Sequence, residues 1–325
     1  MEISEVILSD LLNGKSNLSN EIVLNLSIML GTSEDVWLNL QKTYNEKIIE
    51  IERRKIEAYE AGSAQFIDYS YFVDLGVVPK ARKSSDKAIE LLKYFKIASF
   101  NVLKNTDFLV NCKTGVSMIN EKNLINSNAW VQTALNIGQQ IVTESFDLRK
   151  LNNYLSEIRK LTLLNSVDFL PRLRESLASC GVAFVVLPHL KNSSVNGVVK
   201  WINKEKVLLA ISKRRKYADI FWFSLFHGIG HVLQKKITSL IVDIDVEKMD
   251  EASESLEREA DDFAKNILLP MDYYSEFLRD KDYSEEAIKG FANRIGIHPG
   301  IVVDRLQIEE KIGFERSNGL RENIT

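Results

Sequence analysis

Apolar residues near the start of the chain recur at helical spacing and are separated by residues that begin or end helices. A first helix is expected over about residues 3–12, ending before Gly14, because Gly readily takes the left-handed conformation at a helix end. Ser19 is placed to cap a second helix that ends at Gly31, and Ser33 to cap a third. The third helix should continue into the charged stretch IIEIERRKIEAYEA.

The pattern changes at Gly181 from helical spacing to short runs rich in β-branched residues. The segments VAFVVLP, VNGVVKWI and KVLLAIS predict the three strands of a small sheet, with a turn near Asn203. Between residues 69 and 165 the segments KAIELLKYF and NNYLSEIRKLTLL predict further helices. The fold class expected is therefore α+β and mostly helical.

A chain of 325 residues is long enough for more than one domain. The changes in pattern predict three: residues 1–60, a helical middle domain over 61–165, and a domain over 166–325 that holds the sheet. The composition, 45% hydrophobic and 27% charged, is typical of soluble globular proteins.

No apolar run approaches the roughly 20 residues that span a bilayer, and the first residues are acidic rather than basic. We therefore expect a cytoplasmic protein without a membrane partner. Cys112 and Cys180 lack CxxC spacing, which predicts reduced, buried thiols. A net charge of −3 gives no general attraction to nucleic acid, so any DNA contact requires a local basic patch.

The segment FWFSLFHGIGHVLQKK places His227 and His231 four residues apart, which puts both imidazoles on one face of a helix. This arrangement suits two ligands of one tetrahedral zinc ion. In the later helical segment LEREADDFAKNILLP, Glu257 can supply a third ligand, and Asp261 can accept a hydrogen bond from a liganding imidazole. Two His and one Glu predict one zinc per chain with an open fourth position, as in catalytic sites. A chance pair of histidines beside a solvated acidic helix is the alternative.

A working zinc peptidase has a glutamate directly after the first histidine, where it relays a proton from the attacking water to the leaving amine. Gly228 occupies that position here. Because acid–base catalysis contributes on the order of a hundred- to ten-thousand-fold, turnover should be heavily impaired. The sequence gives no structural reason for this glycine, so a natural pseudoenzyme and a residue changed to silence an active protein both remain open.

Four further residues are candidates for roles near such a centre. His298 can donate a hydrogen bond to a transition state or cap a helix, and Tyr217, shortly before the histidine helix, is a similar candidate. Val198 and Val199 lie on the strand that we expect to form the edge of the sheet, where an extended substrate could pair. Proline at either valine is then expected to abolish substrate binding.

The run FWFSLFHGIGH, followed by EREADDFAKNILLP and IGIHPGIVVDRLQ, resembles the ImmA/IrrE family of bacterial and phage metallopeptidases. In that family a His-Glu-x-x-His helix precedes a Glu-x-x-Ala-Asp/Asn-x-Phe-Ala motif that ends in Leu-x-Pro. The resemblance implies a zincin-like domain in which His227, His231 and Glu257 bind zinc and Asp261 supports a ligand. Gly228 departs from the family's catalytic glutamate.

Upstream, the segment NGKSNLSNEIVLNLSIMLGTSEDVWLNLQKTYNEKIIEIE resembles the later helices of an Xre/HigA-type helix-turn-helix regulator fused to such a peptidase. The two resemblances cover about residues 1–60 and 165–315. They imply action near toxin–antitoxin or mobile-element switches, where the peptidase domain cleaves or senses a partner repressor.

A complete helix-turn-helix domain of that type has two more helices before the first helix expected here. That helix carries Glu2, Glu5 and Asp10 with only Lys15 near its end, whereas phosphate contact requires Lys and Arg. Two functions therefore remain: a metallopeptidase-like regulator with impaired catalysis, or a non-enzymatic regulator that binds a partner protein or DNA. Recovery of cleavage by Gly228→Glu would distinguish them.

Overall fold

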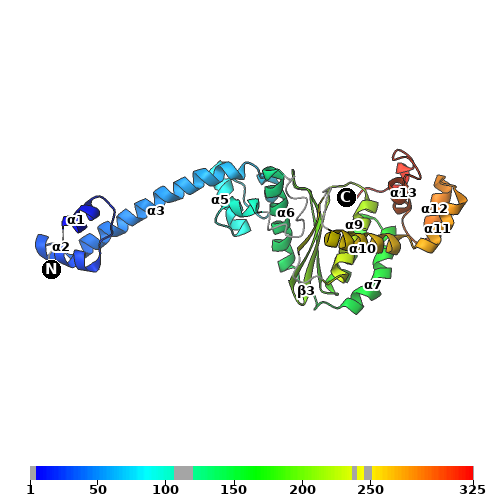
Figure 1. Ribbon diagram of the computed structural model, residues 1–325, viewed down its shortest axis with the longest axis horizontal. Helices are drawn as coiled ribbons and strands as arrows, with labels where there is room; N and C mark the ends of the chain where they lie inside the picture. Colours follow the sequence, from blue (N-terminus) through cyan, green and yellow to red (C-terminus); the bar gives the residue numbers. More distant parts are fainter. Residues whose placement is uncertain (1–4, 106–119, 236–239, 245–250, 325) are drawn as a thin grey trace. The chain divides into compact units, whose positions relative to one another are not determined.

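The computed structural model describes residues 5–105, 120–235, 240–244 and 251–324 (Figure 1). They form a mostly helical α+β fold with one small mixed sheet, which confirms the expected fold class. The chain divides into two compact units, one of Met1–Gln65 with Lys80–Glu90 and the other of Phe66–Pro79 with Leu91–Thr325. The three domains expected from the sequence stay a prediction.

The first unit begins with helices α1 (Glu5–Leu12), α2 (Asn20–Leu30) and α3 (Glu34–Ala64). The Ser19 hydroxyl accepts a hydrogen bond from the Ile22 amide, which caps α2 at its start. Gly31, with a φ of 65°, ends α2 in the left-handed conformation. Ser33 precedes α3, but its side chain makes no capping hydrogen bond. The ends of the predicted helices are thus confirmed within the described residues.

The chain continues through α4 (Tyr69–Asp74), α5 (Ser84–Phe95), α6 (Glu121–Gln140), α7 (Leu148–Lys160) and α8 (Ser166–Ala178). The segments expected to be helical before the sheet lie in α5 and in α7 with the short 3-10 turn that follows it. Cys180 is buried and carries a free thiol, as predicted, and burial raises the pKa of that thiol. Cys112 lies outside the described residues.

The sheet consists of β1 (Val182–Leu187), β2 (Val195–Asn203), β3 (Lys206–Ser212) and β4 (Leu240–Ile244), in the order β1-β3-β2-β4. β1 runs parallel to β3, whereas β2 is antiparallel to both β3 and β4. The expected three-stranded sheet was therefore incomplete. β4 was missed because five residues, one of them Asp243, carry too little periodicity to distinguish a strand from a helix or a loop.

The pairing of β4 with β2 shows that β2 is not the edge strand at which an extended substrate was expected to pair. Val198 pairs with Ala210 on one side and Val242 on the other, and Val199 is paired in the same way on both sides. Strand β2 is therefore internal and presents no free edge to a peptide. Proline at Val198 or Val199 would remove a hydrogen bond from within the sheet, so it would damage the fold rather than substrate binding alone.

Helices cover both faces of the sheet (Figure 1). Helix α6 packs on one face, while α9 (Ala218–Leu233) packs on the other and contacts α10 (Glu251–Leu268). Successive side chains of β3 alternate between these layers, because Leu208 contacts α6 at Gly138 and Leu209 contacts α9 at Gly228. Burial on both faces explains the nearly uninterrupted apolar runs of β1 and β3.

A half-buried arginine fixes the ends of two helices in this unit. The Arg159 guanidinium, from α7, donates hydrogen bonds to the carbonyls of Ile267 and Leu268 at the end of α10. It also donates to the Ile295 carbonyl at the end of α12 (Glu285–Ile295). Because terminal carbonyls have no partner within their own helix, these bonds anchor α10.

The unit is completed by α11 (Met271–Asp280) and α13 (Pro299–Ile308). Within the described residues, no helix combines the length and apolar character needed to cross a membrane.

Candidate metal centre

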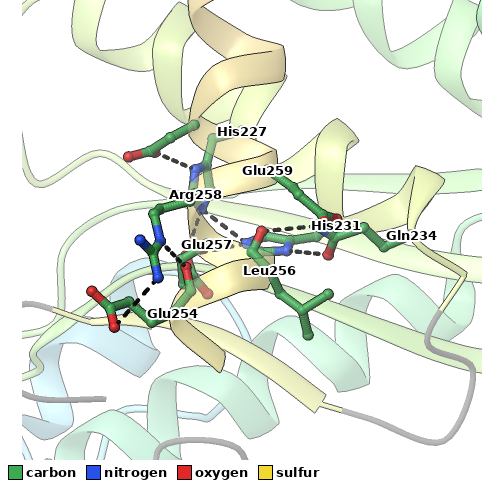
Figure 2. Close-up of polar contacts among 9 residues, drawn as sticks. His227, His231, Gln234, Glu254, Leu256, Glu257, Arg258 and Glu259 are labelled. Carbon is green, nitrogen blue, oxygen red and sulfur yellow. Dashed lines mark hydrogen bonds and ion pairs between the residues drawn. The ribbon is translucent and has the colours of Figure 1, made fainter. Parts of the chain in front are cut away.

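His227 and His231 project from α9 toward α10 (Figure 2). They lie one helical turn apart, and their Nε2 atoms are 3.0 Å from each other. Both rings are buried, with 8% of His227 and 2% of His231 exposed. Helix α9 is apolar on nearly all sides because it is enclosed between the sheet and α10, so these polar rings require partners.

Glu257 reaches both histidines from α10. Its Oε2 atom lies 3.1 Å from His227 Nε2 and 3.3 Å from His231 Nε2. Burial tends to raise the pKa of Glu257, but hydrogen bonds and charge interactions with the two histidines, when these are protonated, lower it to about 2. The carboxylate is therefore ionised. The structure thus brings together the three residues expected to be ligands, and this triad could hold a metal ion.

The other ring nitrogens are held by acceptors on both sides. His227 Nδ1 lies 2.9 Å from Asp261 Oδ1, and His231 Nδ1 lies 2.9 Å from Gln234 Oε1. The Gln234 amide nitrogen donates to the Leu256 carbonyl, so Gln234 Oε1 must be the atom that accepts. Both Nδ1 atoms therefore carry the proton, and both Nε2 atoms present a lone pair.

Two lone pairs and a carboxylate oxygen that converge within about 3 Å repel one another unless a cation or a proton lies between them. In a tetrahedral zinc site with bonds of about 2.0–2.1 Å, neighbouring donor atoms lie about 3.3 Å apart. The observed separations of 3.0, 3.1 and 3.3 Å match this spacing closely. The donor set and its geometry therefore fit a metal ion.

A glycine allows the two helices of the centre to approach each other. A Cβ atom at Gly230 would lie 3.0 Å from the backbone Cα of Ala260 on α10. Because a backbone atom cannot move aside as a side chain can, a larger residue here would push α10 away. Gly230 therefore permits Glu257 to reach the histidines.

Gly228 also has a structural neighbour, contrary to the expectation from the sequence. A Cβ atom at Gly228 would lie 2.4 Å from Leu209 Cδ1 on β3. Leu209 is only 1% exposed, so it has little room to move away. The Leu209 side chain thus occupies the space that a glutamate at position 228 would need. The Leu209 side chain thus packs directly against Gly228, a contact that the local sequence alone did not reveal.

The structure does not bring Tyr217 or His298 into contact with the triad. Tyr217 is the N-cap residue of α9, and its ring lies beneath the Arg321 guanidinium at 4.0 Å. His298 caps α13, because its Nδ1 accepts a hydrogen bond from the Gly300 amide at 3.2 Å. Burial lowers the pKa of His298, against the opposing charge of Glu322. Catalytic roles for Tyr217 and His298 stay predictions.

Gln234 is the part of the centre that sequence reasoning missed. It lies three residues after His231, a spacing that brings side chains together on one helix face, and this signal could have found it. Its two contacts form a continuous link from the His231 ring to the backbone of α10 at Leu256. Gln234 and Asp261 are therefore the groups that orient the two imidazoles.

A second buried charge cluster lies at the start of α9. Arg321 Nη2 is 2.6 Å from Asp219 Oδ2 and 2.9 Å from Asp304 Oδ1. One cation thus faces two carboxylates. Burial, assisted by the nearby charge of Asp304 and opposed by Arg321, raises the pKa of Asp219 to about 7. Burial also raises the pKa of Asp304, whereas Arg321 and Arg215 oppose that shift.

Part of the chain is similar to a curated protein. Over 57 residues the chain is 39% identical to a protein described as an uncharacterized HTH-type transcriptional regulator, YddM, of Escherichia coli (strain K12). The aligned segment covers 16% of this chain and 61% of YddM. No protein-family model matches the chain. The match supports a helix-turn-helix regulatory element.

Proposed function

We propose that this protein is a zinc-metallopeptidase-like regulator of ImmA/IrrE type, joined to a helix-turn-helix-like element and strongly impaired in peptide hydrolysis. The observation that carries the proposal is the convergence of His227 Nε2, His231 Nε2 and Glu257 Oε2. Three acceptor atoms held in this way need a cation or a proton between them, and the tetrahedral spacing of the atoms favours a metal ion.

Zinc suits the donor set best, because two imidazole nitrogens and one carboxylate oxygen are a common set at catalytic zinc sites. When bound, zinc supplies a Lewis acid that can polarise a peptide carbonyl. His227, His231 and Glu257 would hold the ion, while Asp261 and Gln234 would orient the imidazoles. Gly228 offers no group that can accept or deliver a proton, so hydrolysis should be weak.

A regulatory role is supported by the likeness of a 57-residue segment to YddM. Residues 1–65 contain six Lys and Arg against eleven Asp and Glu, a balance that disfavours contact with phosphate. The proposed partner is therefore a protein or peptide, such as a repressor or a toxin–antitoxin component, rather than DNA.

The alternative is a non-enzymatic regulator that keeps the metal site for structure or sensing. The packing of Leu209 against Gly228 favours it, because the space for a catalytic glutamate is already filled. In this alternative the triad would still bind metal, so the same first experiment applies to both.

Elemental analysis of the purified protein should find about one zinc per chain, and His231→Ala should lose it, because two ligands rarely retain zinc. His298→Ala is the matched control, since His298 caps α13 and lies outside the triad. It should keep the metal. Absence of metal from the unaltered protein, or equal metal in His231→Ala, would contradict the proposal.

Gln234→Ala should weaken zinc affinity roughly ten- to a hundredfold, as is usual when a residue that orients a ligand is removed. Gln234→Glu keeps an oxygen acceptor for His231 Nδ1 but loses the donation to the Leu256 carbonyl, so its affinity should lie between those of the alanine variant and the unaltered protein. Competition with a chromophoric chelator measures both affinities. Equal affinities for the alanine and glutamate variants would show that Gln234 does not orient His231.

A further inference from the structure

A cavity of about 420 Å³ lies beside the start of α9. It is enclosed by the end of β3, by α9, by α13 and by the last residues of the chain. Its walls are mainly apolar and aromatic: Ile220, Phe221, Phe223, Ile308, Phe314 and Ile324. This volume and lining are typical of pockets that bind a small molecule or a large side chain.

The cavity adjoins the metal centre. Ile211 and Ser224 line both the cavity and the small space that reaches His227, Gly228 and His231. Phe223, another lining residue, lies one turn before His227, and the two ring centroids are 6.2 Å apart. A chain passing over the triad would therefore be able to place one side chain in the cavity.

The mouth of the cavity is basic. Lys213, Arg214 and Arg215 line it consecutively, and both arginines are exposed. The acidic lining residue, Asp304, pairs with Arg321 at 2.9 Å and also interacts with Arg215, so one carboxylate faces four basic lining residues. Among the described residues, Arg321 Nε finds no hydrogen-bond partner. An acidic ligand is favoured by this charge distribution.

We propose that the cavity is a specificity pocket for a bulky apolar side chain, such as phenylalanine, in an extended protein segment whose neighbouring residues are acidic. The apolar wall would bury the aromatic ring, and Arg214 and Arg215 would attract the flanking carboxylates. The inference that the pocket lies beside a reacting bond rests on the proposed metallopeptidase-like function. The inference that the pocket binds the peptide does not depend on that function.

Three peptides with fluorescein on the N-terminal amine test the proposal by fluorescence anisotropy: AEDFEA-amide, the same peptide with Ala in place of Phe, and the same peptide with Lys in place of Glu and Asp. The first should bind roughly ten- to a hundredfold more tightly than the second, because burial of the ring is lost. It should also bind more tightly than the third, and salt should reduce that difference. Equal affinities for the first two would overturn the proposal.

Two pairs of variants locate the binding. Arg214→Glu with Arg215→Glu should weaken binding of the acidic peptide at least tenfold, whereas Arg172→Glu with Arg174→Glu, two exposed arginines of α8, should not. Phe314→Ala removes an exposed ring of the cavity wall and should weaken only the Phe peptide. Val167→Ala, at an exposed position on α8, is its control. Unchanged binding in both cavity variants would overturn the assignment.

The measurement is made on zinc-loaded and on chelator-treated protein. If zinc binds to the triad but the Phe and Ala peptides bind equally, the pocket proposal fails and the proposed function stands. In the opposite case no zinc binds, the protein prefers the Phe peptide to the Ala peptide, and Arg214→Glu with Arg215→Glu weakens binding of the Phe peptide. The pocket proposal then stands and the proposed function fails. The two conclusions are thus tested separately.

Discussion

Gly228→Glu alone should lower stability by about 1–3 kcal/mol, because its Cβ would lie 2.4 Å from Leu209 Cδ1 in a packed interior. Combined with Leu209→Ala, the glutamate gains room and can act as the missing base. Peptide hydrolysis should then rise on the order of a hundred- to ten-thousand-fold over the unaltered protein. The single variant should remain far less active than the double variant.

Urea unfolding of the two single variants and the double variant forms a double-mutant cycle. The double variant should lose less free energy of unfolding than the two single variants lose together. We expect the difference to be roughly 0.5–3 kcal/mol, as for residues in direct contact. Hydrolysis is followed by mass spectrometry with the zinc-loaded protein and the acidic Phe peptide. Gly228→Gln with Leu209→Ala is the control, because glutamine has the same size but is not a base.

The outcomes separate the two functions. Equal hydrolysis by the Glu and Gln double variants would show that position 228 supplies no base. A folded, zinc-loaded Glu double variant without activity would leave the non-enzymatic regulator as the better account.

Arg321→Met should destabilise the fold by about 3–5 kcal/mol, as is usual when one partner of a buried ion pair is removed. Arg321 and Asp219 have side chains only 7% and 1% exposed, and Asp304 also depends on this cation. The cluster joins the last residues of the chain to α9, where the Ala218 amide donates to the Glu322 carbonyl. Loss of this ion-pair cluster should therefore destabilise the start of α9.

The stability lost in Arg321→Met should be larger at pH 8 than at pH 5. The pKa of Asp219 is about 7 in the folded protein, against an ordinary value of 3.8. A raised pKa means that the folded state favours the protonated acid, so this contribution to stability is present below about pH 4 and disappears as pH rises through about 7. Without Arg321, two buried carboxylates would face each other once both ionise.

Urea unfolding at pH 5 and pH 8 measures this dependence. Asp219→Asn is the matched control, because it resembles the protonated acid and leaves Arg321 paired with Asp304. At pH 8, Asp219→Asn should lower the free energy of unfolding less than Arg321→Met does. In the Asp219→Asn variant, stability should also fall less between pH 5 and pH 8 than in the unaltered protein. An equal cost of Arg321→Met at both pH values would show that the carboxylates do not titrate in this range.

The sequence by itself determined the local features of this protein. Ser19 and Gly31 marked helix ends because capping depends on residues only a few positions away. The spacing of His227 and His231 placed both rings on one helix face for the same reason. The pairing of these histidines with Glu257 was also predicted, because the later acidic helical segment offered a third ligand for the same ion.

Only the tertiary structure decided the features that depend on contacts between distant segments. The pairing of β4 made β2 internal, and the β3 residue Leu209 gave Gly228 its neighbour. Arg321 met Asp219 because the end of the chain returns to α9. Each contact joins residues far apart in sequence, where helical or strand periodicity carries no information about the partner. Their geometry follows from packing two helical layers on one sheet, which no local pattern specifies.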